Sequence, residues 1–395
     1  MNAHTTLITT CRPAINAGWF YVPYEAIPNL AAEKKKLTHK SAYAEKGDLP
    51  IRMYKDLPAE GYLGVPRAYG QVRFAHLQQV DRRVDGEPMF DPIVRLPDPN
   101  HPAVKEPVLQ ARFMVDMEEA TQRLGNFIAY ATTGSGKTVV GARNAAIYHR
   151  KAAILVPLER LLEQWRNELM EKLGVPEHRI GIVQSDTCEW RDKDYVLCMM
   201  KSLGQRRYEP GFYKSIGQVY VDEAHRLGTH ELAATPALFP ARVRIALSAT
   251  PDRKDGSDRT IFWHVGQVEV KSEATALDCD IYVRSLDASH MNGIQCLDRK
   301  KLMGIMLKKL TLWDYRNQML ANDIVRLWRA GRLILAMSDH VAHVQDIMER
   351  VVRMGIPRSQ IGQCTGERVV VGVAQSLRVV DRQRLHDRRA MRVDG

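Results

Sequence analysis

Long hydrophobic runs are missing from this sequence, and with them any segment able to span a membrane. The first residues, MNAHTTLITTCRP, lack the basic and then apolar order of a secretory signal peptide. Both absences argue against a membrane-embedded or exported protein. We therefore expect a cytoplasmic protein without a membrane partner, and its 395 residues suffice for two or three domains.

Cysteine is sparse and scattered. No two cysteines form a C-x-x-C pair, which argues against a structural zinc site or a disulfide framework. Reduced thiols in the protein core are expected instead. The cysteines are Cys11, Cys188, Cys198, Cys279, Cys296 and Cys364.

Acidic residues are outnumbered, with 46 Asp and Glu against 57 Lys and Arg, which gives a net charge of +11. This excess favours a polyanionic partner, because each phosphate that a Lys or Arg neutralises releases bound counterions. Many basic proteins bind no nucleic acid, so composition alone does not decide the question.

Residues 1–105 differ in composition from the rest of the chain. They are rich in proline and aromatic residues and end in a proline-rich linker at residues 96–102. The pattern predicts a small accessory domain of mixed structure. The basic run at residues 34–36 is typical of a solvated surface, and the role of the domain stays open.

From residue 106 onward short apolar segments alternate with amphipathic ones, which predicts an α/β fold with a parallel sheet covered by helices on both faces. A helix is expected over residues 158–173. Its apolar face carries Leu161, Leu162, Trp165 and Leu169. The expected strands are residues 127–131, 152–156, 179–183, 195–199, 218–221 and 243–247. Functional loops of such sheets cluster at the carboxyl ends of the strands.

The most informative stretch is NFIAYATTGSGKT, residues 126–138. Apolar residues of strand character run into a loop with two glycines, then Lys and Thr, and then a helix-compatible segment. Gly134 and Gly136 would let successive backbone N–H groups face an anion at a helix N-terminus. Lys137 would reach the β- and γ-phosphates of a nucleotide, and Thr138 would ligate Mg²⁺.

Ala131 stands where the strict motif has glycine, so a glycine-rich turn beside a surface lysine is the competing interpretation. A second strand exit bears on this choice, because residues 218–221 lead directly into the carboxylates Asp222 and Glu223. Asp222 suits a Mg²⁺ ligand, and Glu223 suits the group that deprotonates an attacking water. Alone, this pair would be a solvated turn. In the same predicted sheet as the phosphate loop, the two segments can converge on one Mg-nucleotide.

A third strand exit carries LSATPDRKDG, residues 247–256. The hydroxyls of Ser248 and Thr250 would link the carboxylate site to a neighbouring domain through hydrogen bonds. Taken alone, the tripeptide Ser-Ala-Thr at residues 248–250 is a weak signal. The ordered set ATTGSGKT, VPLERLLEQW, VDEAH and LSATPDRKDG resembles the superfamily 2 helicases with a DEAH box, and within them the branch of UvsW-type and XPB-type helicases. The resemblance covers roughly residues 106–366.

The resemblance implies a RecA-like P-loop NTPase domain over residues 106–275, with ATP and Mg²⁺ as cofactors, and it removes the glycine-rich-turn interpretation. It assigns nucleotide binding to Gln110, Thr133, Gly134, Ser135, Gly136, Lys137 and Thr138. Gln110 would read the adenine, although a lone glutamine is often only exposed. Asp222 would hold Mg²⁺ together with Thr138, and Glu223 would be the catalytic base beside Lys137.

The remaining assignments concern coupling and nucleic acid. His225, Ser248 and Thr250 would couple hydrolysis to domain movement. Pro157, Arg160 and Gln164 lie in the motif that contacts the nucleic-acid backbone in relatives, whereas Leu161, Leu162 and Trp165 are interpreted as helix core.

Residues 276–395 are expected to form a partial second RecA-like domain. Residues 280–283 look like its entry strand and residues 332–343 like its first strand-and-helix unit. His340 and His343 have a helical spacing that would suit a metal, but the family pattern explains His343 as part of the helix.

After residue 366 the resemblance ends. Relatives continue to a motif of the form Q-x-x-G-R-x-x-R whose arginines reach the γ-phosphate, and residues 383–388 match it only faintly. Such an arginine contributes about 10³ to 10⁵ in rate, and half a RecA-like domain would leave sheet edges open. We therefore expect a truncated chain whose tail is read out of frame or replaced.

The expected function is that of an ATP-dependent helicase or translocase that unwinds or remodels nucleic acid, with DNA favoured over RNA as partner. One alternative is a helicase-like protein that binds ATP and nucleic acid with little turnover. Another is the motor subunit of a restriction system, although the sequence has no nuclease cluster of the P-D…E-x-K kind. Substrate shape, polarity and oligomeric state are not encoded in these motifs.

Overall fold

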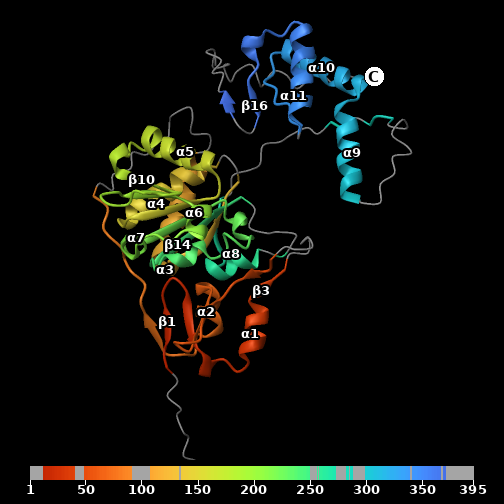
Figure 1. Cartoon of the computed structure of the whole chain (residues 1–395). Coiled ribbons are helices and arrows are strands. Elements are labelled where there is room, and N and C mark those ends of the chain that lie inside the picture. Colours follow the sequence, from red (N-terminus) through yellow and green to blue (C-terminus); the bar gives the residue numbers. More distant parts are fainter. Residues whose placement is uncertain are drawn as a thin grey trace, which may run out of the picture. The chain divides into compact units, whose positions relative to one another are not determined.

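The computed structural model of the protein describes residues 12–40, 49–90, 107–132, 135–249, 256, 258–272, 282–283, 285–287, 299–338, 340–365 and 368–370. The chain divides into two compact units, Met1–Cys279 and Asp280–Gly395. Figure 1 traces both units in colours that follow the sequence. No helix within the described ranges is long and apolar enough to cross a membrane.

An eight-stranded sheet forms the centre of the first unit, in the order β11-β10-β12-β9-β13-β14-β8-β15. Every neighbouring pair is parallel except the edge pair of β10 and β11. The inner strands are nearly continuous apolar runs because both faces of a parallel sheet are buried. The strands are β8 (Asn126–Tyr130), β9 (Ala152–Val156), β10 (Ile180–Gln184), β11 (Thr187–Cys188), β12 (Tyr195–Met199), β13 (Gln218–Asp222), β14 (Val243–Ser248) and β15 (Val268–Lys271).

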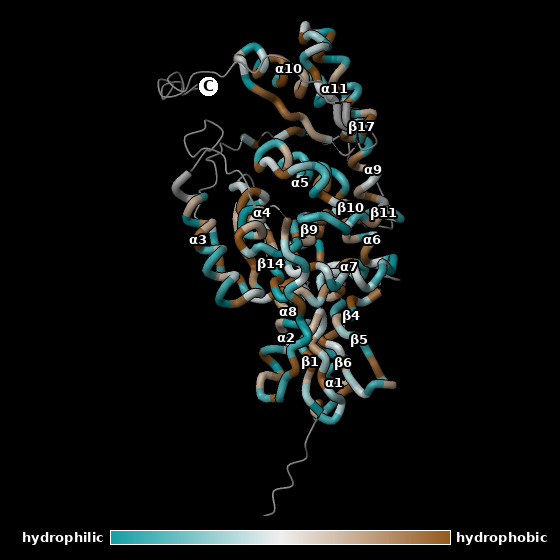
Figure 2. Tube along the Cα trace, turned by 90° about the vertical axis from the view of Figure 1, so that its left-hand side faces the viewer, coloured by the Kyte–Doolittle hydropathy of each residue, from teal (hydrophilic) through white to brown (hydrophobic). Residues whose placement is uncertain are grey.

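Helices cover both faces of this sheet (Figure 1), and alternate strand residues contribute to opposite cores. Phe127 and Ile154 pack with α3, α4 and α5, whereas Ile128 and Leu155 pack with α6, α7 and α8. Figure 2 shows hydrophilic and hydrophobic positions alternating along α3. The helices are α3 (Pro107–Leu124), α4 (Lys137–Tyr148), α5 (Glu159–Asn167), α6 (Met200–Gln205), α7 (Pro210–Ser215) and α8 (Arg259–His264).

The predicted α/β fold is confirmed. Strands β9 and β12 have the predicted bounds, and β8, β10, β13 and β14 differ from prediction by one residue at one or both ends. The helix expected over residues 158–173 is instead α5 followed by a π-helical turn, η2 (Glu168–Lys172). There the N–H of Leu173 donates to the carbonyl of Glu168, five residues back, at 3.2 Å. Leu162 and Trp165 are buried as predicted, whereas Leu161 is half-buried.

A smaller sheet lies in the same unit, in the order β5-β6-β2-β1-β7. The basic run near its helix α1 is exposed at Lys35 and Lys36, as predicted, but the preceding Glu33 is buried and accepts a hydrogen bond from the Tyr69 hydroxyl. The elements are β1 (Ala14–Asn16), β2 (Phe20–Pro23), α1 (Leu30–Lys36), β3 (Thr38–His39), β4 (Ile51–Arg52), β5 (Lys55–Leu57), β6 (Tyr62–Val65), α2 (Arg67–Arg73) and β7 (Gln79–Asp81).

A strap of residues 82–90 follows β7 and runs along the amino ends of the central strands. Its backbone N–H groups donate to carbonyls just ahead of β14, β13 and β9: Val84 to Pro240, Glu87 to Ser215 and Met89 to His149, at 2.8, 2.7 and 3.3 Å. Farther along, the N–H of Phe90 donates to the Asp194 carboxylate ahead of β12 at 2.7 Å. The strap therefore satisfies backbone groups that the sheet itself leaves unpaired.

Two arginines are fully buried where the small sheet meets the central one. Arg67 donates to the carbonyl of Ala241 and to the side-chain oxygen of Asn126, both at 2.6 Å. Arg244 donates to the carbonyl of Gly18 at 3.0 Å. Burial lowers the pKa of both guanidinium groups, that of Arg244 to about 9. Backbone and amide oxygens stabilise these two charges, so the two sheets must keep their relative positions.

The second unit is helical over most of its described part, with α9 (Arg299–Thr311), α10 (Asp314–Arg329), α11 (Val341–Arg353) and a hairpin of β16 (Gln363–Thr365) and β17 (Arg368–Val370). Helices α10 and α11 share an apolar core that contains Val325 and Ile347. His343 is buried there, and its Nε2 lies 3.1 Å from Oδ1 of Asn317. His343 lies within α11, as the helical interpretation predicted.

The strand expected at the start of residues 332–343 is wrong. Residues 332–338 pair with no described strand, and Leu333 and Leu335 are 95% and 83% exposed. A β-strand exists only through hydrogen bonds to a neighbour, and the described part of this unit supplies none. Of the entry strand expected at residues 280–283, residues 280–281 lie outside the described residues and residues 282–283 belong to no strand.

Replacing Gly217 by alanine tests the strap. A Cβ at this position would lie 1.9 Å from the Asp85 carbonyl oxygen and 2.9 Å from Cβ of Arg150. We expect the free energy of unfolding, measured by denaturant titration, to fall by about 1–3 kcal/mol. The control is Gly211→Ala, whose Cβ would meet only the Trp190 ring at 3.5 Å. Equal losses in both variants would contradict the strap's role.

A second prediction concerns pH. His264 is buried beside Arg244 and Arg67, and burial followed by these two charges lowers its pKa from 6.5 to about 3. Between these two pKa values only the unfolded chain binds the proton. The contribution of neutral His264 to the free energy of unfolding is therefore fully present above pH 6.5 and falls as the pH drops. The loss should reach about 2 kcal/mol at about pH 5. In His264→Phe, the free energy of unfolding should depend less steeply on pH below pH 6.5 than in the unaltered chain. An unchanged slope would refute the low pKa of His264.

Candidate nucleotide-binding and catalytic site

The predicted phosphate loop joins β8 to α4. The N–H of Ala131 donates to the carbonyl of Ser248 at 3.0 Å, which ties the start of the loop to the end of β14. The Ser135 hydroxyl donates to the Thr132 carbonyl at 2.7 Å, and Nζ of Lys137 donates to the Ala131 carbonyl at 3.1 Å. These side-chain hydrogen bonds thus connect the start of the loop, at Ala131 and Thr132, to its end at Ser135 and Lys137. Lys137 is the first residue of α4.

Gly136 caps α4 in a left-handed conformation, with φ of 84°. Glycine is required on two grounds, because this φ is strained for other residues and because a Cβ would lie 2.1 Å from Nε2 of Gln110. The Gln110 amide, from α3, therefore lies against the loop. The structure brings the predicted adenine-reading residue to the phosphate loop itself.

The strand order assembles the remaining parts of the site. Strand β14 lies between β8 and β13, with Ser248 opposite Tyr130 and Leu247 opposite Asp222. Because all three strands are parallel, the phosphate loop, Ser248 and the Asp222–Glu223 pair emerge at the same edge of the sheet. The convergence predicted from the sequence is therefore present.

Asp222 is buried at the end of β13, and donors within the chain occupy both of its oxygens. The indole N–H of Trp165 donates to Oδ2 at 2.8 Å, and the backbone N–H of Glu223 donates to Oδ1 at 2.9 Å. Burial raises the pKa of Asp222, and these two hydrogen bonds and the Lys137 ammonium oppose the rise. Lys137 therefore lies within electrostatic reach of the carboxylate.

Glu223 has a left-handed backbone with φ of 46°, which is uncommon for a residue other than glycine. Such strain costs about 1–3 kcal/mol and persists where the surrounding structure imposes it. The turn brings Oε2 of Glu223 to 3.2 Å from Nδ1 of His225. The acid predicted as base and the histidine predicted as coupling residue are thus in contact.

The residues present fit a magnesium nucleotide. The hydroxyl of Thr138 and the carboxylate of Asp222 are oxygen ligands of the kind that Mg²⁺ prefers. The start of a helix of twelve residues, α4, supplies backbone N–H groups and a partial positive charge for phosphate. Bound Mg²⁺ would neutralise phosphate charge, while Glu223 could take a proton from water.

The residues predicted to contact nucleic acid lie after β9. Pro157 is half-buried, and Arg160 and Gln164 are exposed one helical turn apart on α5. Gln164 also donates to Oε1 of Glu168 at 2.9 Å. They form an outward face on the same helix whose inward face carries Trp165.

Sequence reasoning missed the hydrogen bond that Trp165 donates to the Asp222 carboxylate. Trp165 is buried, as the helix-core interpretation predicted, yet its polar N–H needs a partner once water is excluded. That need was the available signal. Of the other predicted residues, Thr133, Gly134 and Thr250 lie outside the described residues.

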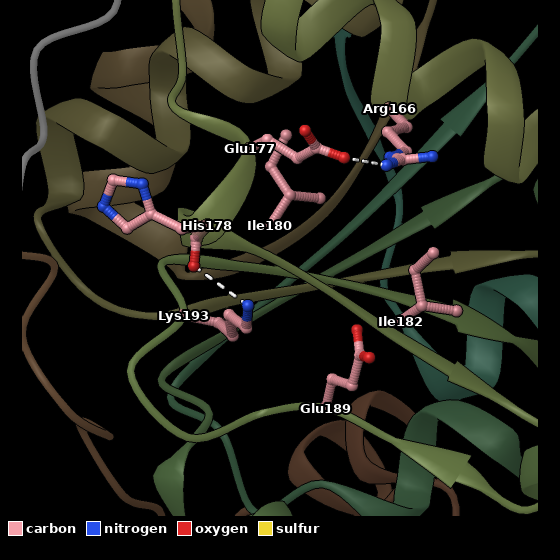
Figure 3. A pocket seen from close by; sticks show the side chains of 7 residues that line it. All are labelled: Arg166, Glu177, His178, Ile180, Ile182, Glu189 and Lys193. Carbon is pink, nitrogen blue, oxygen red and sulfur yellow. Dashed lines mark hydrogen bonds and ion pairs between the residues drawn. The ribbon is translucent and has the colours of Figure 1, made fainter.

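A surface hollow of about 610 Å³ lies elsewhere in the first unit. Figure 3 shows its lining, where Arg166 pairs with Glu177 and Nζ of Lys193 donates to the His178 carbonyl. None of the predicted nucleotide-site residues lines it. The candidate site therefore depends on the strand ends and not on this hollow.

Gly136→Ala should impair nucleotide binding without unfolding the chain. The left-handed backbone costs a non-glycine residue about 1–2 kcal/mol, and the new methyl group would displace Gln110 from the loop. We expect the dissociation constant for Mg-ATP, measured by calorimetry, to rise at least about tenfold, since 1.4 kcal/mol corresponds to that factor. Ser135→Gly, which leaves the backbone unstrained, is the comparison. Unaltered affinity in Gly136→Ala would exclude this loop as the phosphate site.

Comparisons with known proteins found similar sequences. Residues 103–253 match the family model described as the res subunit of type III restriction enzymes. QP509L of African swine fever virus (isolate Pig/Kenya/KEN-50/1950), which is named as an ATP-dependent RNA helicase, is 28% identical over 212 residues, covering 52% of this chain and 41% of the relative. The transcript termination protein OPG145 of variola virus (isolate Human/India/Ind3/1967) is 25% identical over 374 residues, covering 89% and 72%.

The chain thus spans less than half the length of the first of these relatives, at 41%. Among solved structures, the UvsW helicase from bacteriophage T4 aligns over 61% of this chain and 92% of its own, with 13% identity and a TM-score of 0.42. The family match covers the predicted phosphate loop, Asp222 and Glu223, and residues 247–253 of the third strand exit. For this segment, the matches support the predicted resemblance to the superfamily 2 helicases.

Proposed function

We propose that the protein is an ATP-dependent motor that couples nucleotide hydrolysis to movement on nucleic acid. The observation that carries the proposal is the convergence of Lys137, Asp222 and Glu223 at one edge of the sheet, with Ser248 on the strand between them. These groups supply the parts that phosphoryl transfer to water needs: a phosphate cradle, a metal ligand and a base.

Each group has one task in the proposed reaction. Lys137 and the N-terminus of α4 bind the β- and γ-phosphates, and Thr138 and Asp222 hold Mg²⁺. Glu223 orients the attacking water and accepts its proton. Its contact with His225 at 3.2 Å gives the base a neighbour that can respond to the reaction. His225 and Ser248, together with Thr250, are proposed to relay that response to a neighbouring domain.

The proposed partner is nucleic acid, bound through the outer face of α5. Arg160 and Gln164 are exposed there and suit phosphate oxygens, and the net charge of +11 favours a polyanion. We propose DNA as the preferred substrate. RNA is the competing candidate, because QP509L carries the name of an RNA helicase. Unwinding or branch remodelling would be the outcome of the movement.

Residues 276–395 are proposed to form part of a second RecA-like domain, and Asp280–Gly395 of this range is a compact unit of its own. The alternative of binding with little turnover applies if this unit supplies no arginine to the γ-phosphate. The two cases differ in rate and not in affinity, because a missing arginine finger lowers turnover by about 10³ to 10⁵.

The test measures ATP hydrolysis by the full chain alone and with single-stranded, duplex and forked DNA and RNA. We expect nucleic acid to stimulate the rate, DNA more than RNA. Lys137→Ala should abolish hydrolysis while nucleic-acid binding persists. Glu223→Gln should retain ATP affinity and lose at least about 10² in turnover, the range of general-base catalysis. The matched control, Glu231→Gln, changes an exposed glutamate in the segment that follows.

Three outcomes separate the alternatives. An ATP hydrolysis rate that no added nucleic acid changes would refute the motor proposal. Tight binding of ATP and nucleic acid with no measurable turnover would establish the low-turnover alternative. Stimulation by RNA alone would reverse the proposed substrate preference.

A further inference from the structure

Trp165 joins two parts of the first unit that the proposed function treats separately. It belongs to α5, whose outer face carries Arg160 and Gln164, and it is 1% exposed on the inner face. Its indole N–H donates to Oδ2 of Asp222 at 2.8 Å. One side chain therefore links the proposed nucleic-acid helix directly to the proposed metal ligand.

The contact fixes the orientation of the carboxylate. The N–H of Glu223 holds Oδ1 at 2.9 Å while the indole holds Oδ2, so Asp222 cannot rotate without breaking one of the two hydrogen bonds. The lone pairs that remain face away from these donors. While both hydrogen bonds are made, the carboxylate keeps one orientation; a carboxylate that loses the indole donor would sample other orientations.

Trp165 also packs against the helix that begins at the phosphate loop. Its Cη2 lies 3.5 Å from the position that a Cβ of Gly141 would occupy on α4. Absence of a side chain at Gly141 thus allows the indole to lie close to the α4 backbone. A shift of α5 would therefore displace both Asp222 and α4, because closely packed side chains transmit small displacements.

We propose that Trp165 is a positioning residue through which occupancy of the outer face of α5 by a nucleic-acid backbone sets the geometry of Asp222. The inference rests on the proposed function and adds the physical route of its regulation. In this route, phosphate contacts at Arg160 and Gln164 hold α5 in place. The indole N–H then holds the carboxylate in the orientation that receives Mg²⁺. Nucleic acid would stimulate hydrolysis by raising the fraction of chains with this orientation.

A second tryptophan provides a matched comparison. The Trp190 indole N–H donates to Oε1 of Glu209 at 2.6 Å, and this side chain is 8% exposed. Trp190 therefore makes the same type of hydrogen bond in the same unit, away from the strand ends that form the nucleotide site. Its replacement removes an equivalent tryptophan-to-carboxylate bond without touching Asp222.

The experiment compares the full chain with Trp165→Phe and Trp190→Phe. Phenylalanine keeps an aromatic ring and removes the N–H donor. For Trp165→Phe we expect the Mg²⁺ concentration for half-maximal hydrolysis to rise about tenfold or more, in the range found for partners of metal ligands. Nucleotide binding with Mg²⁺ chelated should stay unchanged, as should nucleic-acid affinity. The stimulation of kcat by nucleic acid should fall at least about tenfold, with little change in KM.

A purely structural role for Trp165 would give a different result. In that case Trp165→Phe would lower the melting temperature and weaken nucleotide binding equally with and without Mg²⁺. Any effect of the control Trp190→Phe should be of this general kind. A folded Trp165→Phe chain with the Mg²⁺ requirement and stimulation of the unaltered protein would overturn the inference. If Trp165→Phe fails to fold, Trp165→Met, which adapts to irregular space, takes its place with the same expected outcomes.

Failure of the motor proposal is distinguishable from failure of this inference. If nucleic acid does not stimulate the unaltered chain, the proposed function fails, and so does the regulatory route. If stimulation is present in the unaltered chain and undiminished in the folded Trp165 variants, only the inference fails. Binding of a fluorescent ATP analogue across a Mg²⁺ titration gives a readout that does not require turnover.

Discussion

The backbone hydrogen bonds of β14 are the constraint on which the site depends. This strand separates β8 from β13 and holds their carboxyl ends level, with Ser248 opposite Tyr130 and Leu247 opposite Asp222. The relative positions of Lys137, Ser248 and Asp222 follow from that register, because a shift by one residue would exchange the side chains that fill the two cores. The predicted phosphate loop follows β8 and Asp222 ends β13, so β14 between them sets their separation.

The central sheet was predictable from sequence, because buried parallel strands are continuous apolar runs. The meeting of the candidate site residues at one edge was predictable because the carboxyl ends of parallel strands lie together. What was missed has physical reasons. The contact of Trp165 with Asp222 joins residues far apart in the chain, and periodicity marks the tryptophan only as apolar. The strand expected within residues 332–338 failed because local β-propensity does not supply a neighbouring strand.

The buried arginines and the strap together attach the small sheet to the central sheet. Arg67 and Arg244 satisfy carbonyl oxygens across the junction, and each would be left with uncompensated charge if the sheets separated. The strap adds backbone hydrogen bonds along the amino ends of the strands. Both features act at the amino ends of the central strands, so the small sheet is attached without involving Lys137, Asp222 or Glu223.

The strap also bears on where a functional fragment can begin. Composition suggests the linker at residues 96–102 as the natural cutting point, but a chain that starts there would lack the segment that covers the amino ends of β14, β13, β9 and β12. Such a fragment would present open backbone donors and acceptors to other copies and invite association through them. The hydrogen bonding of the central sheet therefore begins by Val84, ahead of the linker that composition suggests.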